Sequence, residues 1–368
     1  MLIVLVDKGD NYFTECFGVK SYAEIPLFHK NLFGFLKSGI NNFFEENQVV
    51  LTENKSNVFG NSIVVSSVKE LVDYINALGC KRVAFIYLNT FILFDYSRFL
   101  SALKSNDNLF VSDKNNNVFG GVFNSNQAIN LLKYSNISDL CELKKHRNFT
   151  FFNCIDGGRI INNIKDYKSL VDEILNGKYS VELPCDGNGI FCAGKIPKGD
   201  FTIVPPVYFG RDIQIEAGAV IGPYSAIYDS SLVAKNSTIK NSILLNNCFI
   251  SKDCFLHNCM CCSNVSVRRA SSILSGAVIG SDLLLSEKTV VESDAFITEF
   301  VINNDDALLN FISERDDVIK SESEDGTVEF SNSDFNIRFN KYFHKNAKIM
   351  LKASSFEIAE ELISNLIK

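Results

Sequence analysis

Tryptophan is absent from this 368-residue chain, and proline, histidine and methionine are scarce, at six, four and three residues. Basic residues are also outnumbered, with 36 Lys and Arg against 43 Asp and Glu, which gives a formal net charge of −7. A protein that follows the phosphate backbone of a nucleic acid needs a basic face. We therefore expect that nucleic acid is not a partner of this chain.

Long apolar runs are missing as well. The longest apolar stretch, residues 83–94, contains Asn89 and Thr90 and falls short of the roughly 20 residues that a membrane-spanning helix needs. The apolar N-terminal run has no basic segment before it and meets Asp7 at once, unlike a secretory signal. The sequence thus predicts a soluble, cytoplasmic protein with no membrane partner.

Cysteine, by contrast, is plentiful, with eleven residues. The densest group is Cys254, Cys259, Cys261 and Cys262, in which only Cys259 and Cys262 have a C-x-x-C spacing. A structural zinc site usually contains two such pairs. In a reducing compartment a free cysteine behaves as a small buried hydrophobe, so core packing is the favoured interpretation.

Short β-rich runs alternate with helical patterns over residues 1–180, which predicts an α/β layer with a largely parallel sheet. Ser67 and Glu70 form a capping box that opens one helix, and Gly79 ends it. The expected strands are 2–6, 48–51, 62–66, 83–88 and 149–154, and the expected helices are 27–38, 67–79, 97–103, 127–134, 139–145 and 165–175.

An internal period of six follows, with five of the six prolines at its beginning, between residues 184 and 223. In a hexapeptide β-helix each six residues form one side of a triangular coil, and one aliphatic residue points inward. The pattern predicts about five such coils within residues 185–300, and it predicts corners at Gly210, Gly222 and Gly280. The expected inward residues are Phe209, Ile215, Ile221, Ile227, Val233, Ile239, Leu245, Ile250, Leu256, Cys262, Val267, Ile273, Ile279, Leu285, Val291 and Ile297.

Residues 301–368 predict a third, small α+β domain. A short helix is expected over 307–312, and strands over 327–330, 335–339 and 348–352. Ser354 and Glu357 form a second capping box in front of an amphipathic final helix.

An α/β domain followed by a left-handed parallel β-helix is the layout of sugar-1-phosphate nucleotidylyltransferases, and several segments resemble that family. Residues 25–32 resemble its lysine-proline-leucine segment, and residues 85–96 are similar to the strand that carries its N-G-D motif. The other similar segments are 118–123 for the sugar-side strand, 152–158 with Asp166 and Tyr167 for W-x-D-x-G-T-P-x-D-Y, and 206–210, 219–224 and 239–244 for the β-helix of GDP-mannose and ADP-glucose pyrophosphorylases.

This resemblance implies a Rossmann-like nucleotidyltransferase domain at residues 1–180, a β-helix at 185–300 and an α+β cap at 301–368. It implies that a nucleoside triphosphate and a hexose 1-phosphate yield a sugar nucleotide and pyrophosphate, with Mg²⁺ if the chain is active. It also implies substrate contacts at Gly120, Gly121, Asp156 and Lys30, with Asp156 as a metal ligand. For Asp156 a cap on the Gly157–Gly158 turn is the alternative. Lys8 is a second candidate for a phosphate contact, and for Lys8 and Lys30 a solvated surface position is the alternative.

The chain departs from the family pattern where the chemistry is most demanding. The glycine-rich loop after the first strand is replaced by Asp7-Lys8-Gly9-Asp10-Asn11, with no arginine, and Phe91 stands where the first metal aspartate is expected. The resemblance therefore points to a degenerate enzyme that acts as a regulatory or ligand-binding subunit. A sugar phosphate or nucleotide sugar is the expected ligand, in a homo-oligomer or a hetero-oligomer with an active paralogue. A divergent active enzyme remains the alternative.

Three further patterns stay open. Hexapeptide β-helices also serve acyltransferases, in which a histidine acts as general base, and His257 is the histidine of this region. Arg268 and Arg269 are candidates to bind an anionic ligand or a partner chain, and the alternative is that they lie in a solvent-facing turn. Residues 325–330 and 353–362 resemble the last domain of phosphohexomutases, but the phosphate loop of that family is missing, so mutase activity is not expected.

Overall fold

The computed structural model describes the chain except for residues 8–11, 42–47, 54–55, 95–97, 99–100, 102–107, 114, 116, 135–149, 154, 180, 182, 184–185, 187, 303–314, 316, 324–326, 341–346 and 367–368. By its contacts the chain divides into two compact units. Unit 1 comprises Met1–Thr14 and Val19–Ser180, and unit 2 comprises Glu15–Gly18 and Val181–Lys368. None of the described helices is long and apolar enough to cross a bilayer.

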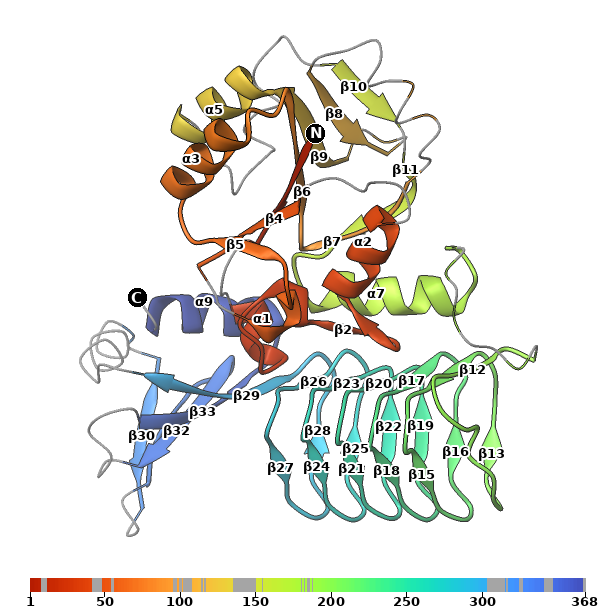
Figure 1. Cartoon of the computed structure of the whole chain (residues 1–368). Helices are drawn as coiled ribbons and strands as arrows, with labels where there is room; N and C mark the ends of the chain where they lie inside the picture. The colour runs from red at the N-terminus through yellow and green to blue at the C-terminus, as the bar shows by residue number, and fades with distance from the viewer. Residues whose placement is uncertain are drawn as a thin grey trace. The chain divides into compact units, whose positions relative to one another are not determined.

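A seven-stranded mixed sheet forms the centre of unit 1 (Figure 1). The strand β9 runs antiparallel to both of its neighbours, whereas the pairs on either side of it are parallel. All five residues of β1 are buried, as expected for a parallel strand covered on both faces. In spatial order the strands are β10 (Thr150–Asn153), β8 (Leu109–Ser112), β9 (Val118–Asn124), β6 (Arg82–Tyr87), β1 (Leu2–Val6), β4 (Gln48–Leu51) and β5 (Ile63–Val65).

The helices of unit 1 confirm one predicted cap. The N–H of Glu70 donates to the Ser67 hydroxyl oxygen at 3.2 Å, and Gly79 ends the helix with a φ of +61°. The described helices are α2 (Leu32–Asn41), α3 (Val68–Leu78), α5 (Ser125–Tyr134) and α7 (Ile164–Leu175), with short 3₁₀ turns at η1 (Tyr22–Glu24) and η2 (Asn57–Phe59). The helix α1 (Tyr12–Cys16) begins in unit 1 and ends in the segment that belongs to unit 2.

The helix predicted over 27–38 is wrong at its start. A hairpin of β2 (Pro26–Leu27) and β3 (Lys30–Asn31) precedes α2. The Asn31 side chain accepts from the N–H of Gly34 at 2.7 Å, which places a capping interaction just before the helix. The helix predicted over 139–145 lies outside the described residues, as does most of the one predicted over 97–103.

Unit 2 contains short strands stacked in three parallel sheets, an arrangement consistent with a parallel β-helix (Figure 1). Each strand pairs with the one that lies 17 or 18 residues further along. The first sheet contains β12 (Ile190–Cys192), β14 (Val207–Phe209), β17 (Ser225–Ile227), β20 (Ile243–Leu244), β23 (Met260–Cys261), β26 (Val278–Ile279) and β29 (Phe296–Ile302). The second contains β13 (Thr202–Ile203), β16 (Val220–Ile221), β19 (Thr238–Lys240), β22 (Phe255–His257), β25 (Ser272–Ile273) and β28 (Val290–Val291). The third contains β15 (Gln214–Ile215), β18 (Leu232–Val233), β21 (Phe249–Ile250), β24 (Ser266–Val267) and β27 (Leu284–Leu285).

The inward ladder follows the predicted period, with two residues corrected. Leu244 and Cys261 face the core and pair with each other in register, whereas Leu245 and Cys262 were predicted there. Two steps of five residues interrupt the period of six. They run from Ile239 to Leu244 and from Leu256 to Cys261, whereas the predicted ladder placed them just after Leu245 and Cys262. Both neighbours in each pair are fully buried, so hydrophobicity alone did not distinguish them.

Most corners of the coils lie three residues after an inward position, and Asn241 and Asn258 lie two residues after one. Of the three predicted corner glycines, Gly222 has a positive φ of +96°, whereas Gly210 and Gly280 do not. Asparagine, aspartate and glycine tolerate this left-handed backbone best, and they dominate the set. The corner residues are Asp212, Gly218, Tyr224, Ser230, Asn236, Asn241, Asn247, Asp253, Asn258, Asn264, Ala270, Gly276, Asp282, Lys288 and Asp294.

The C-terminal strands extend one sheet of the stacked strands. The strand β29 pairs antiparallel with β33 (Ala347–Ala353), and the sheet continues through β32 (Phe335–Asn340), β31 (Thr327–Ser331) and β30 (Ile319–Glu322). The final helix is α9 (Phe356–Leu366). Ser355 rather than Ser354 caps it, because the N–H of Ile358 donates to the Ser355 hydroxyl oxygen at 3.3 Å. The helix predicted over 307–312 lies outside the described residues.

Candidate functional site

Two of the segments that carry the family resemblance meet in a separate antiparallel ribbon of unit 1. It pairs β7 (Thr90–Phe94) with β11 (Ile155–Ile160). Ile155 lies opposite Phe94 and Gly157 lies opposite Leu93, so Asp156 is an extra residue at a bulge. Bulges redirect side chains and are frequent beside functional sites. The side chain of Asp156 lies outside the described part of the chain, so its role as a ligand stays a prediction.

Phe91 is the residue that the resemblance places at the first metal aspartate of the family, and its surroundings are apolar. It is 3% exposed, and its ring centroid lies 6.1 Å from that of Phe35 and 5.4 Å from that of Tyr179. An ionised carboxylate buried among such rings would lose its hydration without a compensating charge. The residues at this position therefore do not fit a Mg²⁺ site built from two aspartates.

Asn89 is also occupied in a structural contact. It is 1% exposed, and its side-chain amide donates to the Asn162 side-chain oxygen at 3.1 Å and to the Ile161 carbonyl at 3.4 Å. In turn, the N–H of Ile161 donates to the Asn89 carbonyl at 2.8 Å. These bonds tie the turn between β6 and β7 to the segment that leads from β11 into α7.

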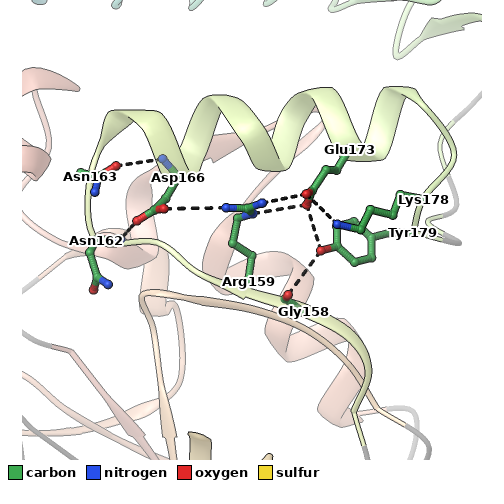
Figure 2. Close-up of polar contacts among 8 residues, drawn as sticks. All are labelled: Gly158, Arg159, Asn162, Asn163, Asp166, Glu173, Lys178 and Tyr179. Carbon is green, nitrogen blue, oxygen red and sulfur yellow. Dashed lines mark hydrogen bonds and ion pairs between the residues drawn. The ribbon is translucent and has the colours of Figure 1, made fainter. Parts of the chain in front are cut away.

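A network of charged side chains holds β11 against α7 (Figure 2). The Arg159 guanidinium donates to Glu173 at 2.7 and 3.3 Å and lies 3.7 Å from an Asp166 oxygen. The Glu173 carboxylate also accepts from the Lys178 ammonium at 2.6 Å and from the Tyr179 hydroxyl at 2.9 Å. We call this set, Arg159, Asp166, Glu173, Lys178 and Tyr179, the Arg159 clasp.

The titration of the Arg159 clasp reflects these contacts. Partial burial acts to raise the pKa of Glu173, but hydrogen bonds from Arg159, Lys178 and Tyr179 outweigh it and lower the pKa to about 2. Burial and the bond to Glu173 raise the pKa of Tyr179 to about 12. Glu173 is therefore ionised and Tyr179 neutral at physiological pH, which keeps the network intact.

Further contacts connect the Arg159 clasp with the bulged ribbon. The Tyr179 hydroxyl lies 3.3 Å from the Gly158 carbonyl, and a side chain at Gly157 would meet the Tyr179 ring at 2.7 Å. Sequence analysis missed the clasp because its other members lie 7 to 20 residues after Arg159 and no motif joins them. The alternation of an arginine on a strand with acids on the next helix was the available signal.

The two glycines predicted to contact substrate lie within the central sheet. Gly120 and Gly121 belong to β9, which runs between β6 and β8, and both are buried. A Cβ on Gly121 would lie 2.6 Å from the Phe123 ring, and one on Gly120 would collide with the Phe85 carbonyl. The structure thus gives both glycines a packing role, and their contact with a sugar stays a prediction.

Lys30 lies on the exposed end of the β2–β3 hairpin, near the ribbon. Its ammonium donates to the Ser38 hydroxyl at 3.0 Å and lies 5.3 Å from the centre of the Phe35 ring, which in turn packs on Phe91. Phe119, next to Gly120, would touch a side chain at Gly158 at 2.9 Å. Phe35 thus connects Lys30 with the ribbon, and Phe119 connects the ribbon with the strand that carries Gly120. Lys8 lies outside the described residues.

The remaining candidates are in unit 2. His257 is exposed on β22, and its ring is stacked on Phe255 at 6.1 Å, which is not the orienting partner that a general base needs. Cys254, Cys259, Cys261 and Cys262 are buried free thiols, and burial raises the pKa of Cys262. Within the described ranges, no group of three His, Cys, Asp or Glu side chains is arranged to hold a metal ion.

Comparison with known proteins adds one finding. Residues 203–306 match the family model of the GMPPB C-terminal domain. The match lies in the stacked strands of unit 2 and supports a GDP-mannose pyrophosphorylase-like family. No curated protein matches the chain.

Proposed function

We propose that this chain is a degenerate sugar-nucleotide pyrophosphorylase that binds a sugar phosphate or nucleotide sugar and acts as a regulatory subunit. The matched domain at residues 203–306 supports the family. The mixed α/β sheet of unit 1, followed by parallel strands in three sheets, supports a Rossmann-like nucleotidyltransferase domain and a left-handed β-helix.

The observation that carries the loss of catalysis is the burial of Phe91 between two aromatic rings. Transfer of a nucleotidyl group requires that developing charge on the phosphates be neutralised by metal, cations and backbone N–H groups. The chain has Phe91 in place of a metal aspartate, and it lacks the arginine and most glycines of the first loop. Removal of one such group typically lowers a rate by about 10²- to 10³-fold.

The ligand is expected at the bulged ribbon, near Asp156, Gly120 and Gly121, with Lys30 as a candidate phosphate contact. The Arg159 clasp supports this position because it holds β11 rigidly without supplying chemistry of its own. As a regulatory subunit, the chain would work in the cytoplasm as a homo-oligomer or together with an active paralogue.

Hydrogen exchange with mass spectrometry tests this proposal directly. The full chain is incubated with GDP-mannose, ADP-glucose, mannose 1-phosphate or glucose 1-phosphate, without Mg²⁺. We expect at least one of these ligands to slow exchange in peptides that cover residues 118–123 and 155–160, because bound phosphate and sugar exclude water there. Peptides from 207–297 serve as the internal control. Protection confined to 207–297, or none with any ligand, would refute the proposed site.

A further inference from the structure

One corner of the stacked strands carries a row of cations. The N–H of Asp253 donates to the Lys235 carbonyl at 3.0 Å, that of Ala270 to the Lys252 carbonyl at 3.1 Å, and that of Lys288 to the Arg269 carbonyl at 2.9 Å. These bonds place Lys235, Lys252 and Arg269 at the same position of successive coils. We call the exposed residues of this corner the basic ridge: Lys235, Lys252, Arg268, Arg269 and Lys288.

The charge of the basic ridge contrasts with that of the chain. The five cations share this corner with the carboxylates of Glu216, Asp253 and Glu287, whereas the whole chain carries a net charge of −7. Two of the carboxylates already have partners, since Glu216 accepts from the N–H of Lys235 at 3.0 Å and Asp253 lies 3.7 Å from the Arg269 guanidinium. A positive strip on an acidic protein favours a ligand that carries negative charge along a line.

Exposed apolar side chains flank the basic ridge on both sides. Phe249 and Leu284, on the sheet before the corner, are 40% and 58% exposed, and Phe255 and Val290, on the sheet after it, are 41% and 58% exposed. From β14 to β29, the equivalent outward residues of the first sheet are at most 6% exposed; they are Tyr208, Ala226, Ile243, Met260, Val278 and Phe296. Apolar surface of this kind beside a charged strip is typical of a protein-binding surface.

The spacing of the coils indicates which secondary structure matches the strip. Neighbouring strands in a sheet lie about 4.8 Å apart, so the cations of the basic ridge repeat at that distance. One face of an α-helix repeats about every 5.4 Å, whereas one face of an extended strand repeats about every 6.8 Å. A helix that lies along the corner therefore stays nearly in register over three coils. The long side chains of Lys and Arg can compensate for the small difference between the two spacings.

We propose that the basic ridge docks an acidic amphipathic helix of a partner protein. Its carboxylates, spaced alternately three and four residues apart, face Lys235, Lys252 and Arg269, and its apolar stripe packs on the column that contains Leu232, Phe249 and Leu284. The other flank is less suited, because the Phe255 ring is stacked on His257. This inference is independent of any catalysis or ligand binding in unit 1.

The test measures fluorescence anisotropy with the full chain and a designed labelled helix of about 18 residues, or five turns. The peptide has Glu at alternating spacings of three and four residues and Leu along the adjacent stripe, and a scrambled peptide of the same composition is the reference. We expect saturable binding at low ionic strength that weakens as salt is added. Equal binding of the scrambled peptide would overturn the proposal.

Charge-reversal variants locate the binding surface. Lys252→Glu with Arg269→Glu is expected to weaken binding about tenfold or more, because each reversal replaces attraction by repulsion. Lys195→Glu with Lys240→Glu, which alters exposed lysines at the other two corners of the coils, is expected to leave the affinity for the peptide within about twofold. Phe249→Ser is expected to weaken binding, and Phe255→Ser is not. Circular dichroism verifies folding, and Lys252→Gln with Arg269→Gln replaces the reversal if it does not fold.

Other classes of partner are tested in the same assay. Vesicles that contain phosphatidylglycerol and a single-stranded RNA are titrated as competitors of the labelled peptide. Preferential binding of either one, with loss of that binding in Lys252→Glu with Arg269→Glu, would contradict the proposal. Equal weakening of peptide binding by the Lys195 and Lys240 control would contradict it as well, since it would show a nonspecific effect of charge.

Discussion

Replacement of Glu173 by glutamine removes the charge at the centre of the Arg159 clasp and keeps most of the side-chain shape. In the native chain this carboxylate accepts from Arg159, Lys178 and Tyr179. Glutamine retains one acceptor oxygen but places an amide NH₂ where two donors point. We therefore expect Glu173→Gln to destabilise unit 1 at neutral pH and to loosen β11 from α7.

The magnitude follows from the pKa of Glu173, which falls from its ordinary 4.5 to about 2 in the folded chain. A difference of this size corresponds to about 3 kcal/mol of preferential stabilisation of the ionised form. The side chain is 20% exposed, and water screens part of the interaction, so about 1–2 kcal/mol is expected. Because the folded pKa is the lower one, this contribution is complete above pH 4.5 and is lost as the pH falls towards 2.

Urea unfolding followed by circular dichroism at 222 nm measures this effect, because α2, α3, α5 and α7 all belong to unit 1. The native chain and Glu173→Gln are compared from pH 7 down to pH 3. Asp172, whose burial raises its pKa to about 6, titrates in both proteins and largely cancels in the difference. A stability difference that stays constant over this range would refute the electrostatic account of the Arg159 clasp.

Three other predictions concern packing and assembly. Ile221→Asp is expected to destabilise the stacked strands by several kcal/mol, because it buries an unpaired charge at a fully buried position, and Ile221→Val should cost only about 1 kcal/mol in the same urea titration. Cys248, whose pKa burial raises to about 12, and Cys262 should resist a thiol reagent in the native chain and react after denaturation; rapid labelling of either one would contradict the packing. Light scattering should give a mass above the 41.1 kDa of one chain, and a monomer at micromolar concentration would contradict the proposed oligomer.

The period of six predicted the stacked parallel strands because each inward position excludes water in the same way, coil after coil. It did not locate the five-residue steps, since Leu244 and Leu245 are equally apolar and both are buried. The corners were placed wrongly for a different reason. Gly210 and Gly280 stood out in the sequence, but the left-handed backbone is supplied mainly by Asn and Asp three residues after the inward positions.

Around the candidate site, local signals predicted caps and strands but not contacts between distant segments. Ser67 and Gly79 delimit α3 as expected, because capping depends on neighbouring residues. The pairing of Arg159 with Glu173 depends on how β11 lies against α7, which no local pattern specifies. The position of Phe91 was identified from the family resemblance, whereas its burial among rings came only from the structure.

A pyrophosphate-release assay tests the central claim most directly. The chain is supplied with each common nucleoside triphosphate, paired with glucose, mannose or N-acetylglucosamine 1-phosphate, in the presence of Mg²⁺. We predict release near background, because the residues around Phe91 do not fit the metal site and because the proposed function assigns a degenerate phosphate cradle to this chain. Robust turnover with any pair, abolished by Asp156→Ala and retained in the exposed control Asp73→Ala, would contradict the account.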